Sequence, residues 1–431
     1  MIPSIEKASA VEIKKFQEEK LREQLAYLAA NSPFYQQHFK THHVDIAEIQ
    51  TLEDLVQIPP TVKEDLQEHN DDFLCVPKHE IIDYVTTSGT LGDPVTFALT
   101  DKDLERLAYN EALSFACAGV GKQDVLQLMT TIDRRFMAGL AYFLGARKLE
   151  AGIIRVGPGI PELQWDSILK FKPTYLIAIP SFLLKLMAYA EQNNIDINNS
   201  GIKGVICIGE PLRDHDLSLN TLGKKIKSKW DINLYSTYAS TEMSTAFTEC
   251  EMQQGGHHHP ELIIAEILDD NNRPVPKGEA GELTITTLGV EGMPLLRFKT
   301  GDIVQAYTEP CSCGRNTMRL GPIIGRKKQM IKYKGTTLYP PVLDNVLNDF
   351  SEIQSYVIEI DHNSYGIDEI CIKISASDTS ERLMKKIRDH FRTKIRVLPL
   401  IEFHDFESIQ KLKFPKMSRK PITVIDHRRG G

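Results

Sequence analysis

The stretch YVTTSGTLGDPVTFALT, residues 84–100, joins a loop of hydroxyl and glycine residues, the clamp loop at 86–92, to a short alternating apolar segment. Glycine lets the backbone turn sharply and approach a ligand closely, and successive N–H groups in such a loop can bind an anion. The clamp loop therefore predicts a grip for a polyphosphate, although it lacks the lysine of a Walker-type loop. A polar hairpin turn explains the same residues equally well, so the choice between a phosphate-binding loop and a turn depends on the other motifs of the chain.

The composition is that of a globular protein with more than one domain. The chain has 431 residues, of which 42% are hydrophobic and 25% charged, and its formal net charge is -7. Two or three domains are expected at this length, and the negative charge argues against a general nucleic-acid partner. No apolar run reaches the length of a membrane-spanning helix. The seven cysteines are odd in number and mostly scattered, which favours a reducing cytoplasm over a disulfide framework.

Apolar runs and helical patterns alternate between residues 101 and 230. Residues 174–179 and 205–208 are short apolar runs, and an amphipathic pattern beginning at Ser181 follows the first of them. This alternation predicts a parallel sheet with helices on its faces. Ligands of such sheets bind at the carboxyl ends of the strands, and Gly209-Glu210-Pro211 falls at such an end.

The pattern changes after about residue 255. Strand-like segments separated by turn residues predict a β-rich section from about 255 to 326. Beyond it, alternating strands and a helix with apolar residues four apart predict a compact α+β domain. The expected fold class is therefore α/β, with a large N-terminal domain at 1–326, built from parallel or mixed sheets flanked by helices plus the β-rich part, and a small C-terminal α+β domain at 327–431.

Five further segments follow the clamp loop in order: IGEP at 208–211, YSTYASTE at 235–242, LRFKTGD at 296–302, GRKKQMIKYKGTTLYP at 325–340 and KMSRKPITVID at 416–426. Their order and spacing resemble those of the adenylate-forming enzymes of the acyl-CoA synthetase superfamily. Within it, the chain is most similar to the phenylacetate–CoA ligase branch. The resemblance covers essentially the whole chain, and six segments in order are a much stronger signal than any one of them.

The resemblance implies an AMP-forming acid–CoA ligase. Such an enzyme uses ATP and Mg²⁺ to convert a carboxylic acid, here an aryl or arylacetic acid, into an acyl adenylate, and then transfers the acyl group to CoA. A homodimer is a reasonable expectation for the family. Two alternatives stay open: an adenylating enzyme with another acceptor, such as a carrier-protein thiol or a deazaflavin cofactor that receives AMP, and a non-catalytic nucleotide-binding regulator.

The resemblance also implies the nucleotide contacts. The β- and γ-phosphates would be held by Thr87, Ser88, Gly89, Thr90 and Gly92. The adenine would lie against Gly209, Glu210 and Pro211, with Ser236, Thr237 and Tyr238 close by. Two residues of the clamp loop, Leu91 and Asp93, depart from the family pattern, in which threonine and a basic residue are common, and so predict a weaker grip.

Five residues would act on the reacting groups. Thr241 would contact the α-phosphate and Glu242 would hold Mg²⁺. Asp302 would accept hydrogen bonds from the ribose hydroxyls, and Arg326 would lie near the ribose or phosphate. Lys420, in the mobile C-terminal domain, would bridge the carboxylate and the α-phosphate as a compact positive charge.

A separate group of cysteines and histidines predicts a structural zinc site. Cys311 and Cys313 form a tight pair, and Cys250 is followed closely by His257. Thiolate and imidazole ligands are typical of tetrahedral zinc in proteins without disulfides. The neighbouring His258 or His259 could replace His257, and free cysteines beside a solvated histidine run are the alternative reading.

Overall fold

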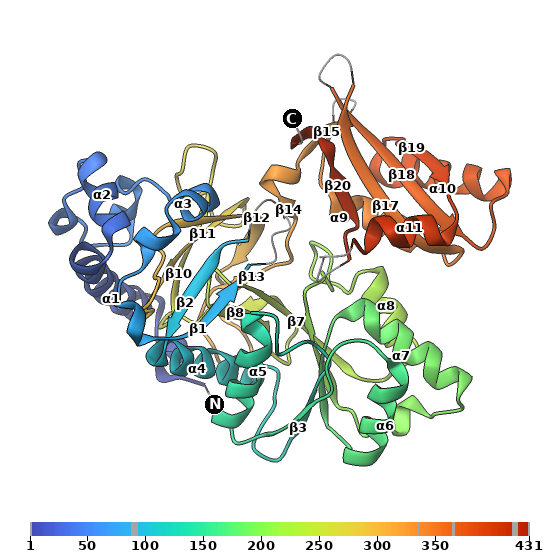
Figure 1. The fold of residues 1–431 in the computed structure, drawn as a ribbon, viewed down its shortest axis with the longest axis horizontal. Helices are drawn as coiled ribbons and strands as arrows, with labels where there is room; N and C mark the ends of the chain where they lie inside the picture. Colours follow the sequence, from blue (N-terminus) through green and yellow to red (C-terminus); the bar gives the residue numbers. More distant parts are fainter. Residues whose placement is uncertain (1, 88–93, 334–335, 364–366, 416–420, 430–431) are drawn as a thin grey trace. The chain divides into compact units, whose positions relative to one another are not determined.

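The computed structural model describes residues 2–87, 94–333, 336–363, 367–415 and 421–429. They form two compact units (Figure 1). The first comprises Met1–Thr300 and Val304–Ile323, and the second comprises Gly301–Ile303 and Ile324–Gly431. The expected domain boundary after Arg326 stays a prediction.

Half of the large sheet in the first unit is parallel. Its strands lie side by side in the order β4 (Gly152–Arg155), β3 (Val125–Leu128), β5 (Tyr175–Ala178), β6 (Gly204–Ile208) and β7 (Asn233–Ser240). Alternate residues of a strand point to opposite faces. In β5, Leu176 and Ala178 accordingly enter one buried core while Tyr175 and Ile177 enter another. The apolar runs in the sequence are therefore strands that are buried on both faces.

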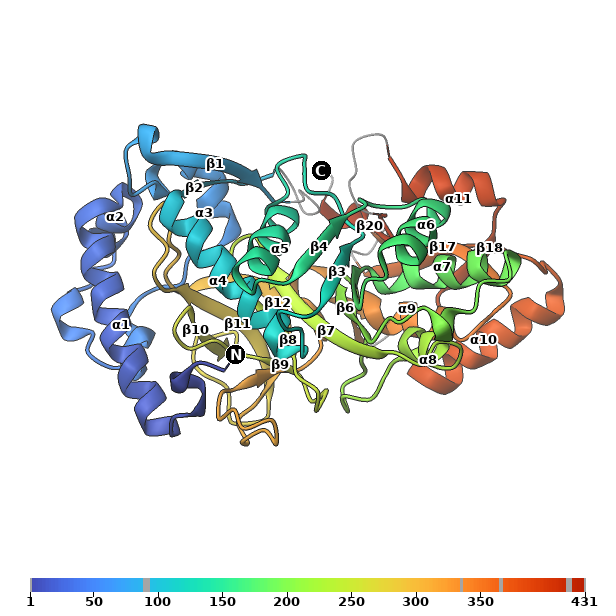
Figure 2. The same ribbon diagram turned by 90° about the horizontal axis from the view of Figure 1, so that it is seen from below.

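Helices cover both faces of this half of the sheet (Figures 1 and 2). One face packs against α4 (Asp101–Cys117) and α5 (Met137–Lys148). The other packs against α6 (Pro161–Phe171), α7 (Pro180–Gln192) and α8 (Thr221–Lys227). Trp165 of α6 and Trp230, which follows α8, stack with their ring centroids 5.8 Å apart in this second core.

The other half of the sheet is antiparallel. It continues from β7 through β8 (Thr245–Glu249), β9 (Gly256–His257), β13 (Arg319–Leu320), β12 (Phe298–Tyr307), β11 (Ala280–Thr287) and β10 (Ile263–Leu268), while β14 (Gly325–Arg326) pairs with β12. The expected mixed sheet and its β-rich section are confirmed, and the antiparallel pairing begins at β8, before the composition change near residue 255.

The N-terminal region packs on this antiparallel half. It contains α1 (Ala10–Asn31), α2 (Pro33–Thr41), α3 (Lys63–Glu68) and the hairpin of β1 (Ile81–Thr86) and β2 (Thr96–Thr100). Ser9 and Glu12 form a capping box at the start of α1, and the apolar stripe of Leu21, Leu25 and Leu28 is buried. The Tyr35 hydroxyl accepts a hydrogen bond of 2.8 Å from the Leu296 backbone N–H.

The second unit is an α+β fold built on the order β19 (Leu400–Phe403), β18 (Asp368–Ala376), β17 (Ile353–His362) and β20 (Val424–Asp426). Its other elements are α9 (Pro340–Asn348), α10 (Glu381–Ile395), α11 (Phe406–Lys413) and the hairpin of β15 (Ile331–Tyr333) and β16 (Thr336–Leu338). Leu383, Ile387 and Phe391, four residues apart on α10, are buried in one core with Ile358 and Ile372. The expected small α+β fold is confirmed.

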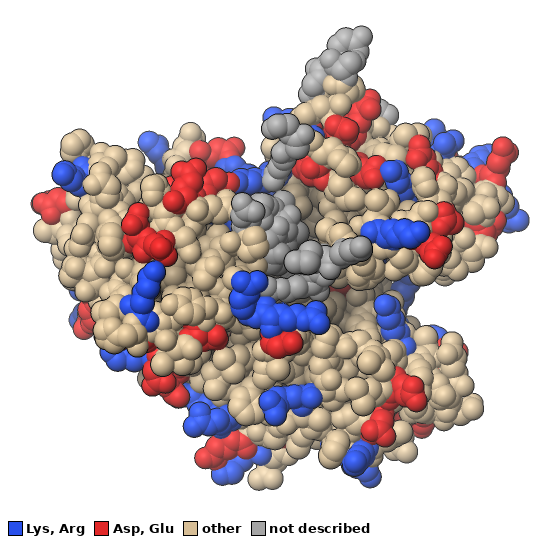
Figure 3. All heavy atoms as spheres, viewed as in Figure 1, with Lys and Arg blue, Asp and Glu red and all other residues tan. Residues whose placement is uncertain are grey.

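The surface gives two further observations. No helix within the described ranges is both long enough and apolar enough to span a bilayer. On the face drawn in Figure 3, acidic and basic side chains of the described residues are interspersed.

Candidate active site

The clamp loop begins and ends on the β1–β2 hairpin. Thr87 is buried, and its backbone N–H donates to the Val95 carbonyl at 2.9 Å while its Oγ1 accepts from the Val95 N–H at 3.0 Å. The Thr86 N–H donates to the carbonyl of Arg135 at 3.0 Å. Thr87 and Val95, the described residues on the two sides of the loop, are thus bonded to each other. Its candidate residues Ser88, Gly89, Thr90 and Gly92, with Leu91 and Asp93, lie outside the described residues.

The loop at 209–211 lies at the carboxyl end of β6. Gly209 has φ +76°, a conformation that glycine adopts without steric cost. The Glu210 carboxylate accepts hydrogen bonds from the backbone N–H and the hydroxyl of Ser181, at 2.8 and 2.7 Å, at the first turn of α7. The Pro211 carbonyl accepts from Asn220 Nδ2 at 2.9 Å. The loop is therefore held between two helices at the edge where parallel sheets bind ligands.

The neighbouring strand β7 carries the next three candidates. Ile208 of β6 pairs with Thr237, so the 209–211 loop and the end of β7 lie next to each other. The Ser236 N–H donates to the Glu249 carboxylate at 2.8 Å. The Thr237 hydroxyl lies 3.2 Å from that of Thr248, and the Tyr238 ring packs against Phe247. These contacts fix the strand that faces the loop.

Thr241 and Glu242 follow in the turn after β7. The Thr241 carbonyl accepts from the backbone and hydroxyl of Ser244, both at 3.3 Å, which closes the turn. Both candidate side chains are partly exposed. Within the part of the chain that the structure describes, no group donates a hydrogen bond to the Glu242 carboxylate. Carboxylate oxygens with open coordination are typical ligands of Mg²⁺.

Asp302 and Arg326 meet in the second unit. They are direct partners in the β12–β14 ladder, and Arg326 Nε donates to Asp302 Oδ1 at 3.2 Å. The Asp302 side chain is 8% exposed, whereas that of Arg326 is 43% exposed. The aspartate is thus held in one orientation by a cation that still reaches solvent. Lys420, the remaining candidate, lies outside the described residues.

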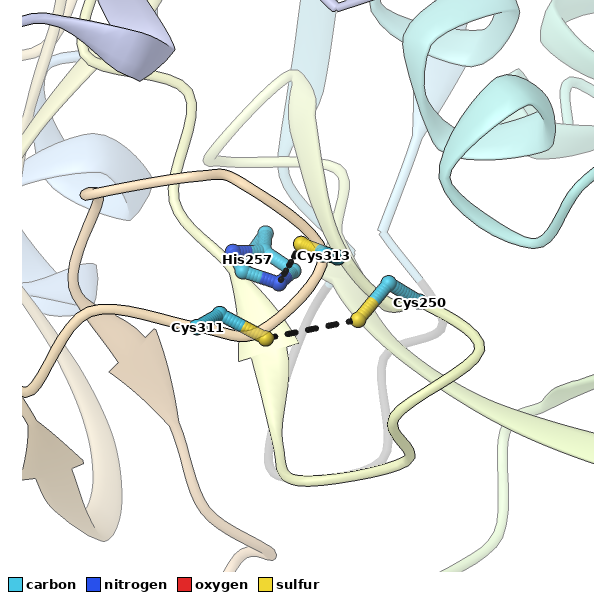
Figure 4. Close-up of side chains that lie close together, drawn as sticks. All are labelled: Cys250, His257, Cys311 and Cys313. Carbon is cyan, nitrogen blue, oxygen red and sulfur yellow. Dashed lines mark hydrogen bonds between the residues drawn. The ribbon is translucent and has the colours of Figure 1, made fainter.

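The structure brings the four predicted metal ligands together (Figure 4). One ligand atom from each of Cys250, His257, Cys311 and Cys313 lies within 4.8 Å of all the others. The sulfurs of Cys250 and Cys311 are 3.7 Å apart, and Cys313 Sγ is 3.5 Å from His257 Nε2. Ligands at about 2.0–2.3 Å from a tetrahedral zinc ion lie roughly 3.3–3.8 Å from one another. The geometry and the soft donor set fit such an ion.

The surroundings of His257 and Cys313 favour their metal-binding states. His257 Nδ1 lies 3.2 Å from the Thr317 hydroxyl, which leaves Nε2 facing the sulfurs. Burial, with a smaller effect of Arg315, lowers the pKa of His257 to about 3, so the imidazole is neutral. Burial raises the pKa of the Cys313 thiol, but Arg315, which donates to its sulfur at 3.5 Å, outweighs that effect and lowers the pKa below its ordinary value.

The two alternative histidines have other contacts. His258 Nε2 lies 2.6 Å from the Ile263 carbonyl, and His259 Nδ1 lies 2.5 Å from the Glu6 carboxylate. Glu6 lies on the 3-10 helix η1 (Ser4–Lys7), is completely buried, and also accepts from Arg315 Nε at 2.7 Å. Glu6 and Arg315 therefore support the metal candidates, although nothing in the sequence pattern singles them out. Their functional importance becomes apparent only from their burial in the structure.

Comparisons with known proteins give matches over most of the chain. The family model described as AMP-binding enzyme matches residues 11–292. The phenylacetate-coenzyme A ligase of Thermus thermophilus is 29% identical over 381 residues, covering 87% of this chain and 84% of that protein. That of Aromatoleum evansii is 26% identical over 439 residues, covering 98% and 96%. The crystal structure of 2-hydroxyisobutyryl-CoA ligase in the postadenylation state, in complex with R3-HIB-AMP, aligns with TM-score 0.85 and 24% identity over 99% of this chain and 92% of that one.

Proposed function

The chain belongs to the AMP-binding enzyme family, as its motifs predict, and from this premise we propose that it is an AMP-forming acid–CoA ligase. The observation that carries the proposal is the edge formed by β6 and β7. There a glycine loop, a row of polar side chains and the Glu242 carboxylate, which receives no hydrogen bond from the described residues, follow one another at the carboxyl ends of parallel strands. The curated relatives named above are phenylacetate-coenzyme A ligases.

The first half-reaction joins the acid to AMP. A carboxylate oxygen of the acid attacks the α-phosphorus of ATP, the bond from that phosphorus to the bridging oxygen breaks, and pyrophosphate leaves. We assign the grip on the leaving phosphates to Thr87–Gly92 and the contact with the α-phosphate to Thr241. A Mg²⁺ ion held by Glu242 would neutralise phosphate charge when bound.

The remaining nucleotide contacts concern the adenine, the ribose and the reacting groups. We assign the adenine face to Gly209, Glu210 and Pro211, with Ser236, Thr237 and Tyr238 beside it. Asp302, oriented by Arg326 at 3.2 Å, accepts hydrogen bonds from the ribose hydroxyls. Lys420 supplies the charge that bridges the acid and the α-phosphate.

The second half-reaction forms the thioester. The CoA sulfur attacks the carbonyl carbon of the acyl adenylate, the carbon–oxygen bond to AMP breaks, and the thiol proton passes to solvent. Lys420→Ala should therefore lose adenylation yet still transfer the acyl group from supplied adenylate to CoA. Equal loss of both half-reactions would contradict the assignment.

The proposed acid is aryl or arylacetic, in keeping with the curated relatives. Pyrophosphate release across a panel of carboxylic acids, with and without CoA, tests both the acid and the acceptor. Release that depends on an arylacetic acid, with a thioester formed only when CoA is present, supports the proposal. Adenylate that accumulates in the presence of free CoA would point to a carrier-protein thiol or a deazaflavin as the acceptor.

We further propose that Cys250, His257, Cys311 and Cys313 hold a structural zinc ion. Four protein ligands leave no open position for substrate, so the ion would tie the turn after β8 to the segment between β12 and β13. Metal analysis of purified protein should give one zinc per chain, and its absence would refute the site.

Localisation and assembly are further proposals. None of the seven cysteines, all of which lie in the described residues, forms a disulfide, which supports a reducing compartment such as the cytoplasm. A homodimer is proposed from the family resemblance alone, and size-exclusion chromatography with light scattering tests it.

A further inference from the structure

A buried ion pair joins the segment after the 209–211 loop to the end of β8. Arg213 binds Glu249 through two hydrogen bonds, Nε to Oε1 at 2.5 Å and Nη2 to Oε2 at 2.9 Å. The side chains are 6% and 1% exposed, respectively. A guanidinium and a carboxylate that meet in this two-pronged geometry are fixed in distance and orientation.

Glu249 also holds backbone that belongs to the candidate nucleotide site. Glu249 Oε2 accepts from the Ser236 N–H at 2.8 Å. The antiparallel ladder between β7 and β8 ends at the pair of Thr237 and Thr248. At Ser236 a side-chain carboxylate therefore accepts the hydrogen bond that a backbone carbonyl of the neighbouring strand would accept within the ladder. This hydrogen bond is partly shielded from solvent, and its loss would leave the N–H without a protein acceptor, so Glu249 helps to fix the position of Ser236.

Arg213 extends the same unit toward the loop. Its Nη1 donates to the Leu217 carbonyl at 3.1 Å, and its Nη2 donates to the Leu234 carbonyl at 3.3 Å and to Gln253 Oε1 at 3.2 Å. Arg213 lies two residues after Pro211, the last residue of the loop. One ion pair therefore fixes the loop and β7 relative to each other, and these are the two elements assigned to the adenine.

We propose that Arg213 and Glu249 are positioning residues for ATP: they touch no substrate, but they hold the 209–211 loop and Ser236 at the separation that the adenine requires. The proposal rests on the proposed function, because it takes the nucleotide assignment of these two elements as given. Positioning that is complete before binding lowers the cost of binding. Losing it should weaken nucleotide binding and leave the acid and CoA sites intact.

The test is the kinetics of Glu249→Gln and Arg213→Lys in the full-length protein. Glu249→Gln keeps the shape of the side chain and one acceptor but leaves the guanidinium without a counter-charge. Arg213→Lys keeps the positive charge but loses the two-pronged geometry of the guanidinium. We expect KM for ATP to rise about tenfold, corresponding to about 1.4 kcal/mol, with kcat and KM for the acid within about twofold of the wild type. Equal rises in both KM values, or no rise for ATP in a folded variant, would overturn the proposal.

A matched control lies where two parallel strands of the same sheet, β3 and β6, begin. Asp124, before β3, pairs with Lys203, before β6, at 2.7 Å and is nearly buried. Asp124→Asn should lower thermal stability without changing KM for ATP, which separates positioning from general destabilisation. A rise in KM for ATP in this variant that matches the rise in Glu249→Gln would overturn the proposal.

Direct binding keeps the test independent of turnover. AMP affinity measured by calorimetry should fall about tenfold in Glu249→Gln relative to the wild type, and equal affinities would overturn the positioning role. If the wild type binds AMP but activates no acid, the acid–CoA ligase proposal fails while the positioning proposal is still decided by this comparison.

Discussion

Glu111 is a carboxyl group buried between α4 and α5, and its ionisation should limit the stability of the first unit. Burial raises its pKa from 4.5 to about 8, against a small opposing effect of its hydrogen bond from Asn110. That bond, 3.1 Å from Asn110 Nδ2 to Glu111 Oε1, is the polar contact that the described residues give it. The helices are close here, since a Cβ on Gly145 would lie 2.3 Å from that of Glu111.

The sign of the pH dependence follows from the raised pKa. Below about pH 4.5 the carboxyl is protonated in both the folded and the unfolded chain and costs nothing. As the pH rises toward 8 the unfolded chain ionises first, so the folded state loses stability progressively. At 1.36 kcal/mol per pH unit, the loss is about 3 kcal/mol at pH 7 and about 1 kcal/mol at pH 5. Glu111→Gln removes the ionisation and should recover these amounts.

Urea unfolding followed by tryptophan fluorescence measures the effect. Both tryptophans, Trp165 and Trp230, are buried in the first unit, so the signal reports on the unit that contains Glu111. The free energy of unfolding of Glu111→Gln should exceed that of the wild type, with a gap that widens between pH 5 and pH 7. The control is Glu105→Gln on the same helix, because the exposed Glu105 carboxylate pairs with Lys148 at 3.0 Å. The free energy of unfolding of this variant should differ little from that of the wild type. A gap for Glu111→Gln that is constant with pH, or negative, would refute the reasoning.

Three other outcomes are expected. Cys311→Ser should purify with less than one zinc per chain and a lower midpoint of thermal unfolding, whereas Cys371→Ser, which alters a cysteine on β18 outside the cluster, should keep its zinc. Asp302→Asn should raise KM for ATP about tenfold without destabilising the fold, because a neutral amide oxygen accepts hydrogen bonds from the ribose hydroxyls less strongly than a carboxylate does. Burial of Glu6 opposes its ionisation, but His259 and Arg315 lower its pKa from 4.5 to about 2. Its stabilisation is therefore full above about pH 4.5 and is lost as the pH falls toward 2, so Glu6→Gln should cost about 3 kcal/mol in urea unfolding at pH 7 and much less at pH 3.

Each of these outcomes can fail clearly. Full zinc content in Cys311→Ser would exclude that thiol as a ligand. An unchanged KM for ATP in Asp302→Asn would remove the ribose assignment. A stability loss in Glu6→Gln that is the same at pH 3 and pH 7 would show that shape rather than charge matters at that position.

Local periodicity was enough to predict the layers of the fold. The spacing of Leu383, Ile387 and Phe391 predicts α10 because a helix brings every fourth residue to one face. The apolar run at 174–179 predicts a doubly buried strand because helices cover both faces of a parallel sheet. The metal cluster was also predictable, since Cys311 and Cys313 are close in sequence and few chemical roles suit such a pair in a protein without disulfides.

The supporting charges could not be predicted in the same way. Glu6 meets Arg315 across 309 positions of the chain, and Arg213 meets Glu249 across 36. In a sequence, a charged residue is assigned to the surface by default, and its burial becomes apparent only when a counter-charge arrives from another element. Periodicity reports the face of one element and carries no information about which distant element will cover it.

The hydrogen bond between Tyr35 and the Leu296 backbone joins residues 261 positions apart. It can therefore form only late in the synthesis of the chain. The helix α1 presents Leu21, Leu25 and Leu28 as one apolar stripe, and the strands on which the N-terminal region packs are made near residue 296. At about 5–20 residues per second, the ribosome needs roughly 13–52 seconds to reach them. Throughout that interval the stripe lacks the strands that bury it in the folded unit.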